Sequence, residues 1–304
     1  MWLSELTQIC DEKLEIIKDC EFDEGYLIGK EEKKSIRVLS FLSDKKFVKD
    51  FLQEHIDAVI CTPEVYELLK KDYEGGICIS HNPKSTFFSF HNYKNQEIKQ
   101  QYSPTVIAES ARIHPTAIIA EKGVHIAENV EIFPYAVVKE GTYIGNDSIV
   151  REYTVVGTPG FYYFGSGKKR TLVQSSGGVV IGENVEIHTN CVVEKGVMGG
   201  TTLIGNNTKI DHSTIIGHDT KIGEECTIAA NALFAGGVKV GANTFAGVSS
   251  TAVPNVKIGA NVKISAGSVI TKNVEDGMHV SGNFALEHSA YIRHLKQIVK
   301  GDTK

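Results

Sequence analysis

The feature that most constrains the fold is an apolar residue that recurs every six positions through most of the chain. Three regular runs have this period: residues 126–156, 181–193 and 204–270. A less regular run precedes them at Ile107, Ile113 and Ile119. A six-residue period fits neither an α-helix nor the two-residue alternation of a single strand. It is typical of a parallel β-helix, in which each hexad supplies one short strand and one corner, and three hexads close a triangular coil. We therefore predict a left-handed β-helix.

Two interruptions of the period are candidates for function, because loops that leave a rigid scaffold often carry binding groups. Residues 157–180 contain four consecutive aromatic residues followed by basic ones, and the hexad between Val193 and Ile204 is longer by five residues. The first loop is expected either to close over substrate or to pack on a neighbouring subunit. Its candidate binding residues are Phe161, Tyr162 and Lys168, with Lys169 and Arg170 beside them.

The chain is predicted to be mainly β, with three domains. Residues 1–103 lack the six-residue period, and their strands alternate with helices, which indicates a small α/β domain. The expected strands lie within 26–43, 57–63 and 75–80, and the expected helices within 44–56 and 64–73. The β-helix is assigned to 104–278. The C-terminal tail, 279–304, is expected to form a short helix with Leu286, Tyr291, Leu295 and Ile298 or Val299 on one side.

Composition excludes several functional classes. The formal net charge is −5, which gives no electrostatic reason to expect nucleic-acid binding. No apolar run approaches the length of a membrane span, and the first residues do not resemble a signal peptide. The six cysteines have no metal-like spacing, so we expect buried thiols in a reducing, cytoplasmic setting.

His218 in "STIIGHDTKIG" is the leading catalytic candidate, because corner residues point away from the filled interior. Gly236 lies eighteen residues later, which is one full coil, so stacking should place the two corners about one strand spacing apart. An imidazole beside an exposed amide suits acyl transfer, since the base takes a proton and the N–H stabilises an oxyanion. His212, one hexad earlier, and His188 are further outward candidates. The simpler interpretation is that these histidines are ordinary surface residues.

The stretch from "VVGTPGFYYF" through "IIGHDTKIGEECTIAANALFAGGVKVG" resembles the UDP-3-O-(3-hydroxyacyl)glucosamine N-acyltransferases of lipid A synthesis. The shared features are the aromatic loop after "VVG", the stretched hexad, and a corner histidine followed by "AGG" one coil later. This resemblance implies that His218 is the catalytic base and that the amide of Gly236 binds the oxyanion.

The resemblance extends into the N-terminal region, through "AVICTP" and "HNP". It implies that the nucleotide base is held at the turn formed by Asn82 and Pro83. The base-stacking aromatic of the family falls at Ser85, with Phe87 and Phe88 close by.

Several positions depart from the family pattern. Asn255 stands where the family has a second functional histidine, and Glu194–Lys195 replaces an acidic–arginine pair. The C-terminal helical region, which the family uses for carrier-protein docking, is short here. These departures favour a relative that N-acylates a nucleotide-diphospho amino sugar, such as a dTDP-amino-dideoxysugar of the anthrose type, for surface glycans. The expected donor is acyl-coenzyme A, with acyl-carrier protein as the alternative.

We expect a homotrimer with no bound cofactor and no metal. In it, grooves between the β-helices of neighbouring subunits would hold the active sites. The substrate-binding candidates also include Glu194, His212 and Asn255. Three alternatives remain open: the lipid A enzyme itself, a non-catalytic trimeric scaffold, and a carbonic-anhydrase-like zinc enzyme. The last would use His188, His212 and His218 as ligands.

Overall fold

The computed structural model describes residues 1–10, 12–28, 36–282 and 288–300. The chain forms two compact units. Unit 1 comprises Met1–Ser103, Pro159–Gly178 and Lys195–Gly200, and unit 2 comprises Pro104–Thr158, Val179–Glu194 and Thr201–Lys304. The sequence analysis expected three continuous domains, whereas each of these two units consists of three separate segments. Both interruptions of the hexad period belong with the N-terminal region, although they lie within the sequence of the β-helix.

Unit 1 is built around a five-stranded sheet with the order β1-β5-β4-β3-β2, in which only β1 is antiparallel to its neighbour. Its strands are β1 (Glu15–Lys18), β2 (Glu24–Gly25), β3 (Val38–Leu42), β4 (Ala58–Cys61) and β5 (Gly76–Ile79). Its helices are α1 (Val48–Gln53), α2 (Pro63–Leu69) and α3 (Pro83–Gln100), with 3-10 turns η1 (Leu3–Gln8), η2 (Lys45–Phe47) and η3 (Gly167–Lys169). The predicted alternation of strands and helices is present, but β1, β2 and the long helix α3 were not predicted.

Helix α3 begins where the sequence offers strong start signals. The Asn82 side chain accepts a hydrogen bond from the Ser85 backbone N–H at 3.3 Å, and Pro83 occupies the first helical position. An asparagine cap satisfies an otherwise unpaired N–H, and proline at this position loses no hydrogen bond. The "NP" dipeptide is therefore a helix start as well as a turn.

The aromatic loop packs on α3 within unit 1. Its hairpin consists of β15 (Tyr163–Phe164) and β16 (Thr171–Leu172), which pair antiparallel. The Asn92 side-chain amide donates to the Leu172 carbonyl at 2.9 Å, and a ring nitrogen of His91 lies 2.8 Å from the Gln174 carbonyl. Phe164 is buried in the same cluster as Phe88. Much of this loop thus completes the core of unit 1.

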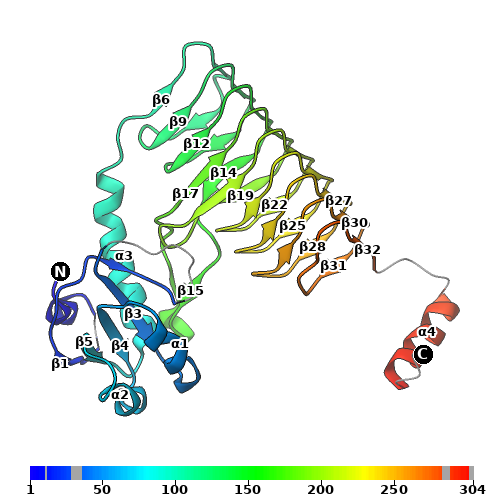
Figure 1. Cartoon of the computed structure of the whole chain (residues 1–304). Helices are drawn as coiled ribbons and strands as arrows, with labels where there is room; N and C mark the ends of the chain where they lie inside the picture. Colours follow the sequence, from blue (N-terminus) through cyan, green and yellow to red (C-terminus); the bar gives the residue numbers. More distant parts are fainter. Residues whose placement is uncertain (11, 29–35, 283–287, 301–304) are drawn as a thin grey trace. The chain divides into compact units, whose positions relative to one another are not determined.

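Unit 2 is a left-handed parallel β-helix, seen in Figure 1 as a ladder of stacked coils. Its first sheet contains β7 (Arg112–Ile113), β10 (Glu131–Ile132), β13 (Ile149–Val150), β18 (Glu186–Ile187), β21 (Lys209–Ile210), β24 (Thr227–Ile228), β27 (Phe245–Ala246), β30 (Lys263–Ile264) and β32 (His279–Val280). The second contains β8 (Ile118–Ile119), β11 (Val137–Val138), β14 (Val155–Thr158), β19 (Val192–Glu194), β22 (Ile215–Ile216), β25 (Leu233–Phe234), β28 (Thr251–Ala252) and β31 (Val269–Ile270). The third contains β6 (Val106–Ile107), β9 (Val124–Ile126), β12 (Thr142–Ile144), β17 (Gly178–Ile181), β20 (Thr201–Ile204), β23 (Lys221–Ile222), β26 (Lys239–Val240) and β29 (Lys257–Ile258).

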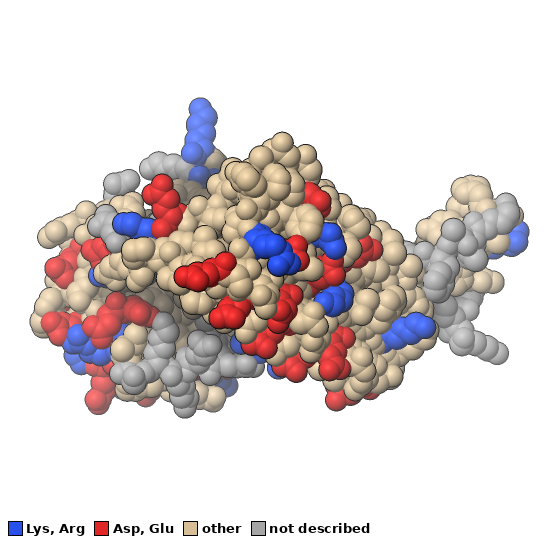
Figure 2. Space-filling model, turned by 90° about the horizontal axis from the view of Figure 1, so that it is seen from above, with Lys and Arg blue, Asp and Glu red and all other residues tan. Residues whose placement is uncertain are grey.

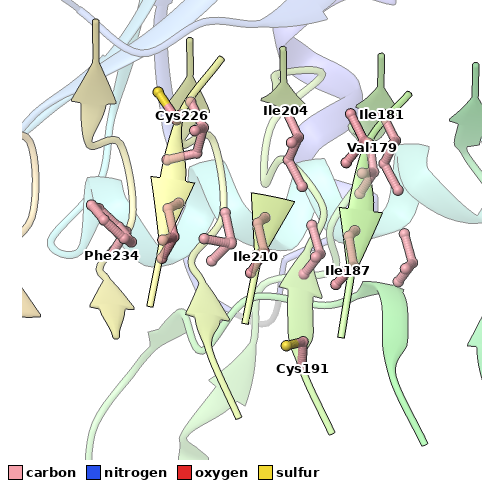
Figure 3. Close-up of a cluster of buried hydrophobic side chains, with 14 of the residues drawn as sticks. Val179, Ile181, Ile187, Cys191, Ile204, Ile210, Cys226 and Phe234 are labelled. Carbon is pink, nitrogen blue, oxygen red and sulfur yellow. The ribbon is translucent and has the colours of Figure 1, made fainter. Parts of the chain in front are cut away.

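The interior of the β-helix is filled by the residues that define the six-residue period, as predicted. Figure 3 shows part of this cluster, including Ile187, Ile204, Ile210 and Phe234, none of which is more than 2% exposed. The exception is the first coil, where Ile107 is 43% exposed because no earlier coil covers it. A filled interior leaves the corners and outer faces for function.

The C-terminal end differs from the prediction that the β-helix ends at residue 278. Strand β32 pairs in parallel with β30, so the ladder continues through Val280. Helix α4 spans His288–Lys300, and Tyr291 and Leu295 on it are exposed. The proposed apolar contacts of Leu286, and those of the Ile298 and Val299 side chains, lie outside the described residues.

In the described part of the chain, no helix combines the length and the apolar character that crossing a membrane requires. Figure 2 shows acidic and basic side chains interspersed on the face in view, rather than one extended basic surface. Cys61, Cys78, Cys191 and Cys226 are buried as expected, whereas Cys10 and Cys20 are only partly buried.

Candidate active site

His218 and Gly236 meet at one corner of the β-helix. Ile216 in β22 pairs with Phe234 in β25, so the residues two positions further along lie at the same corner of consecutive coils. A Cβ atom built on Gly236 would lie 2.5 Å from His218 Nε2 and 2.6 Å from its Cε1. The imidazole therefore lies directly against Gly236, and only a residue without a side chain fits beneath it. The predicted juxtaposition is present.

Asp219 orients the imidazole. His218 Nδ1 lies 2.9 Å from Asp219 Oδ2, and both side chains are 24% exposed. Asp219 has a φ of 60°, and its backbone N–H donates to Thr202 Oγ1 at 2.9 Å. A carboxylate that accepts the Nδ1 proton leaves Nε2 as the basic nitrogen, and Nε2 is the atom beside Gly236.

The N–H of Gly236 has no acceptor among the residues that the structure describes. At two corners that follow strands of the third sheet, the backbone N–H donates to an asparagine in the next coil. The Glu128 N–H donates to Asn146 Oδ1 at 3.1 Å, and the Glu183 N–H donates to Asn206 Oδ1 at 2.9 Å. At Gly236 the corresponding residue is Pro254, which offers no side-chain acceptor. The Gly236 amide is thus available to a ligand oxygen.

Glu194 and Asn255 occupy the coils on either side of this pair. Glu194 Oε2 accepts from the His218 backbone N–H at 3.1 Å. The Asn255 backbone N–H donates to the Gly236 carbonyl at 3.1 Å, and a Cβ on Gly237 would lie 2.4 Å from Asn255 Oδ1. Four of the predicted site residues therefore lie along one edge of unit 2.

Burial raises the pKa of the Glu194 carboxyl, and the hydrogen bond from the His218 N–H offsets only part of that rise. A group with a raised pKa in the folded state contributes stability below its unfolded pKa and loses it as pH rises through the folded value. We expect the free energy of unfolding of the native protein, relative to Glu194→Gln, to increase as pH falls from 7 towards 4. Chemical denaturation across this range measures the difference. The same substitution at exposed Glu224 is the control, and a difference that does not vary with pH would contradict this account.

Unit 1 holds a cavity of about 680 Å³ along helix α3. Among its lining residues are Glu12, Asn82, Ser85, Ser89, Tyr93 and Phe164. Asn82, Ser85, Ser89 and Tyr93 follow one another at intervals of three or four residues along α3 and its N-cap, so they face the same side of the helix. Ligand pockets for small molecules have about this volume, on the order of 300–1,000 Å³. Two of the predicted base-binding residues, Asn82 and Ser85, therefore line a cavity of suitable size.

Phe87 and Phe88 correct the prediction for base stacking. Both rings are 0% exposed and pack in the core of unit 1, so neither offers a face to a ligand. Tyr93 is 45% exposed and lines the cavity, which makes it the accessible aromatic residue there. Sequence reasoning missed Tyr93 because it did not extend a helix beyond the "NP" dipeptide.

The aromatic loop residues divide into two groups. Phe161 is 84% exposed, and Lys168 is also exposed. The Tyr162 ring instead contacts Phe88, with ring centroids 5.4 Å apart, and Lys84 Nζ lies 5.3 Å from the centre of the Tyr162 ring. The Lys169 side chain lies outside the described part of the chain. The loop therefore offers Phe161 and Lys168, but not Tyr162, as fully accessible groups.

His212 lies at a different corner from His218. It follows β21, and its ring centroid is 4.9 Å from that of His188, which follows β18. The zinc alternative required His188, His212 and His218 as ligands of one ion, but the first two meet at the corner after the first sheet and His218 follows β22 of the second. A single chain does not bring these three together.

Three stretches of the chain, residues 123–158, 201–236 and 237–272, match the family described as "Bacterial transferase hexapeptide (six repeats)". The chain is 24% identical over 182 residues to a UDP-3-O-acylglucosamine N-acyltransferase of Paracidovorax citrulli, covering 54% of this chain and 52% of that protein. It is 36% identical over 107 residues to an acyl-[acyl-carrier-protein]--UDP-N-acetylglucosamine O-acyltransferase of Chlamydia caviae, covering 31% and 38%. The chain thus spans about half or less of the length of these relatives. A crystal structure of UDP-N-acetylglucosamine acyltransferase from Francisella novicida aligns with a TM-score of 0.49 and 24% identity, covering 64% of this chain and 72% of that one.

Proposed function

We propose that this protein is a hexapeptide-repeat acyltransferase that moves an acyl group from a thioester to the amine of a nucleotide-linked amino sugar. The observation that carries the proposal is the corner where His218, oriented by Asp219, lies against the available amide of Gly236. Both relatives described above are named as acyltransferases of UDP-linked sugars, which supports the reaction class.

The chemistry follows from these groups. The amine nitrogen attacks the thioester carbonyl, and His218 Nε2 takes the proton that the nitrogen loses. The carbonyl oxygen becomes negative and accepts a hydrogen bond from the Gly236 N–H. The intermediate then forms the amide as the carbon–sulfur bond breaks, and the imidazolium returns the proton to the leaving thiolate. The remaining contribution is positioning, because a thioester is already a reactive acyl donor.

The cavity of unit 1 is the proposed nucleotide site. Asn82, Ser85 and Ser89 supply hydrogen-bonding side chains for a base or ribose, and Tyr93 supplies an aromatic face. We propose a dTDP-amino-dideoxysugar as acceptor and acyl-coenzyme A as donor, since Ser85 and Asn255 depart from the pattern that the sequence otherwise resembles. In a homotrimer, the β-helices of neighbouring subunits would form grooves along the edge that carries His218. Light scattering of the purified protein tests whether it is a trimer.

The second candidate is the reaction in the name of the Paracidovorax citrulli relative, N-acylation of UDP-3-O-acylglucosamine. In that case acyl-carrier protein is the donor suggested by the sequence resemblance. This candidate is favoured by the substrates in the names of the two relatives, because both substrates are UDP-linked sugars.

A screen of donors against acceptors tests the proposal. Short acyl-coenzyme A and acyl-carrier-protein thioesters are combined with UDP- and dTDP-linked amino sugars, and thiol release is followed for each pair. We expect release to depend on both a thioester and an amino sugar. Release with hydroxyl sugars alone would assign the chain to O-acylation, and no release with any pair would favour a non-catalytic scaffold.

Filling the unit 1 cavity should weaken nucleotide binding without altering the chemical step. We expect Ser89→Trp to raise KM for the acceptor at least about 10-fold with little change in kcat. The reason is that the substitution weakens binding of the acceptor equally in the ground state and in the transition state. Steady-state kinetics measures both constants. Lys94→Trp, on the same helix but not among the cavity-lining residues, is the matched control and should leave KM unchanged. A loss of kcat in Ser89→Trp with unchanged KM would mean that this cavity does not bind the acceptor.

A further inference from the structure

His188, Asp211 and His212 converge at one corner of the β-helix. Ile187 pairs with Ile210 in parallel register, so His188 and Asp211, each one residue further on, lie at the same corner of consecutive coils. His212 is the next residue. The register of the coils, rather than a flexible loop, therefore holds the three side chains together.

The geometry is close to that of a metal site. One ligand atom from each residue lies within 4.8 Å of the others, and the two imidazole rings are inclined by 66°. A tetrahedral ion with bonds of about 2.0–2.2 Å requires ligand atoms roughly 3.3–3.5 Å apart, which small side-chain rotations would reach. The side chains are 31%, 44% and 55% exposed for His188, Asp211 and His212, so an ion from solvent has access.

The charges around the cluster favour a cation. Asp211 contributes a carboxylate to the cluster, and the backbone N–H of His212 donates to its Oδ1 at 2.8 Å. Glu186 Oε1 lies 3.3 Å from His188 Nε2 and is held by Arg151 Nε at 2.8 Å. A carboxylate that accepts the second ring N–H of a metal-bound histidine fixes the orientation of that ring. Arg151 and Lys209 are the nearby positive side chains, and Glu186 balances the first of them.

We propose that His188, Asp211 and His212 form a binding site for a divalent transition cation, with Glu186 as the carboxylate that orients His188. Two imidazoles and one carboxylate select zinc, cobalt or nickel over magnesium and calcium, which prefer all-oxygen ligands. The ion would join two consecutive coils, and the inserted residues 195–200 lie between these coils in the sequence. Its role is thus to tie the stack together at the place where the hexad period is broken. The site does not depend on the proposed acyl transfer at His218.

Titration of tag-free protein with Co²⁺, followed by visible absorption and calorimetry, tests the proposal. We expect saturation at one ion per chain and a thermal unfolding midpoint that rises with Co²⁺ or Zn²⁺. Glu186→Gln should weaken binding about 10-fold, and His188→Gln, Asp211→Asn and His212→Gln should each weaken it by about 100-fold or more. The rise in the unfolding midpoint should disappear in the three ligand variants.

His114 provides a matched control because it lies at the same corner as His188, three coils earlier. Its Nδ1 contacts Thr116 Oγ1 at 2.9 Å, and the residue at the same corner of the next coil is Phe133. His114→Gln and His218→Gln should both leave Co²⁺ binding unchanged. Binding that does not saturate at one ion per chain, or that survives all three ligand substitutions, would overturn the proposal.

Discussion

Replacing His218 with alanine is expected to lower turnover by about 10²–10⁴-fold, which is the usual contribution of a general base. The loss should fall on kcat, because the imidazole acts on the attacking amine in the transition state. Thiol release under saturating donor and acceptor measures it. The fold should be retained, since the ring lies at a partly exposed corner rather than in the interior.

Two further variants separate proton transfer from a structural effect. Asp219→Asn keeps the shape of the side chain but removes the charge that orients His218, so it should lower kcat less than His218→Ala and alter the pH–rate profile. His114→Ala removes another corner histidine of the same β-helix and should leave turnover unchanged. Full turnover in His218→Ala would mean that the amine loses its proton to another group.

Gly236→Ala is expected to lower kcat by about 10²–10³-fold, because the added methyl group would displace the imidazole and crowd the amide. The new Cβ would lie 2.5 Å from His218 Nε2, and a ring at the end of a side chain can move away without disturbing the coil. Activity should therefore fall much more than stability. Kinetics and thermal unfolding of the same preparation measure the two effects together.

Gly282→Ala is the matched control, because a Cβ there has no neighbour within 4 Å among the described residues. A double-mutant cycle with His218→Ala sharpens the comparison. If Gly236→Ala acts through the position of the imidazole, the double variant should be little slower than His218→Ala alone. Additive losses would indicate that the amide contributes independently, and normal kcat in Gly236→Ala would remove this glycine from the site.

The position of the candidate site could be predicted because a β-helix converts sequence spacing into spatial position. Eighteen residues make one coil, so His218 and Gly236 could be placed together from their numbers, and the pairing of Ile216 with Phe234 bears this out. The same periodicity identified the interior residues. Asp219, the next residue in the sequence, contacts the His218 ring.

The interruptions could not be placed in the same way, because no period fixes where an inserted segment goes. The aromatic loop belongs to unit 1, where Phe164 joins the core and Asn92 holds the hairpin. Helix α3 was missed although Asn82 and Pro83 carry its start signal. The family resemblance had assigned that dipeptide to a nucleotide-binding turn. As a result Phe87 and Phe88 were wrongly placed at the base, when helical periodicity would have directed attention to Ser89 and Tyr93.

Whether the Gly236 N–H has an acceptor could not be predicted from the spacing. The period places Pro254 at the same corner of the next coil, but it does not fix which corner N–H groups meet a side-chain oxygen.

The most direct test of the account is whether a new amide bond forms in step with thiol release. Native protein is incubated with an acyl thioester and a nucleotide-linked amino sugar, and the product is weighed by mass spectrometry while free thiol is counted. We predict one N-acylated sugar nucleotide for each thiol released, with both lost in His218→Ala. Thiol released without an acylated sugar, or an acylated product that forms equally well in His218→Ala, would contradict the account.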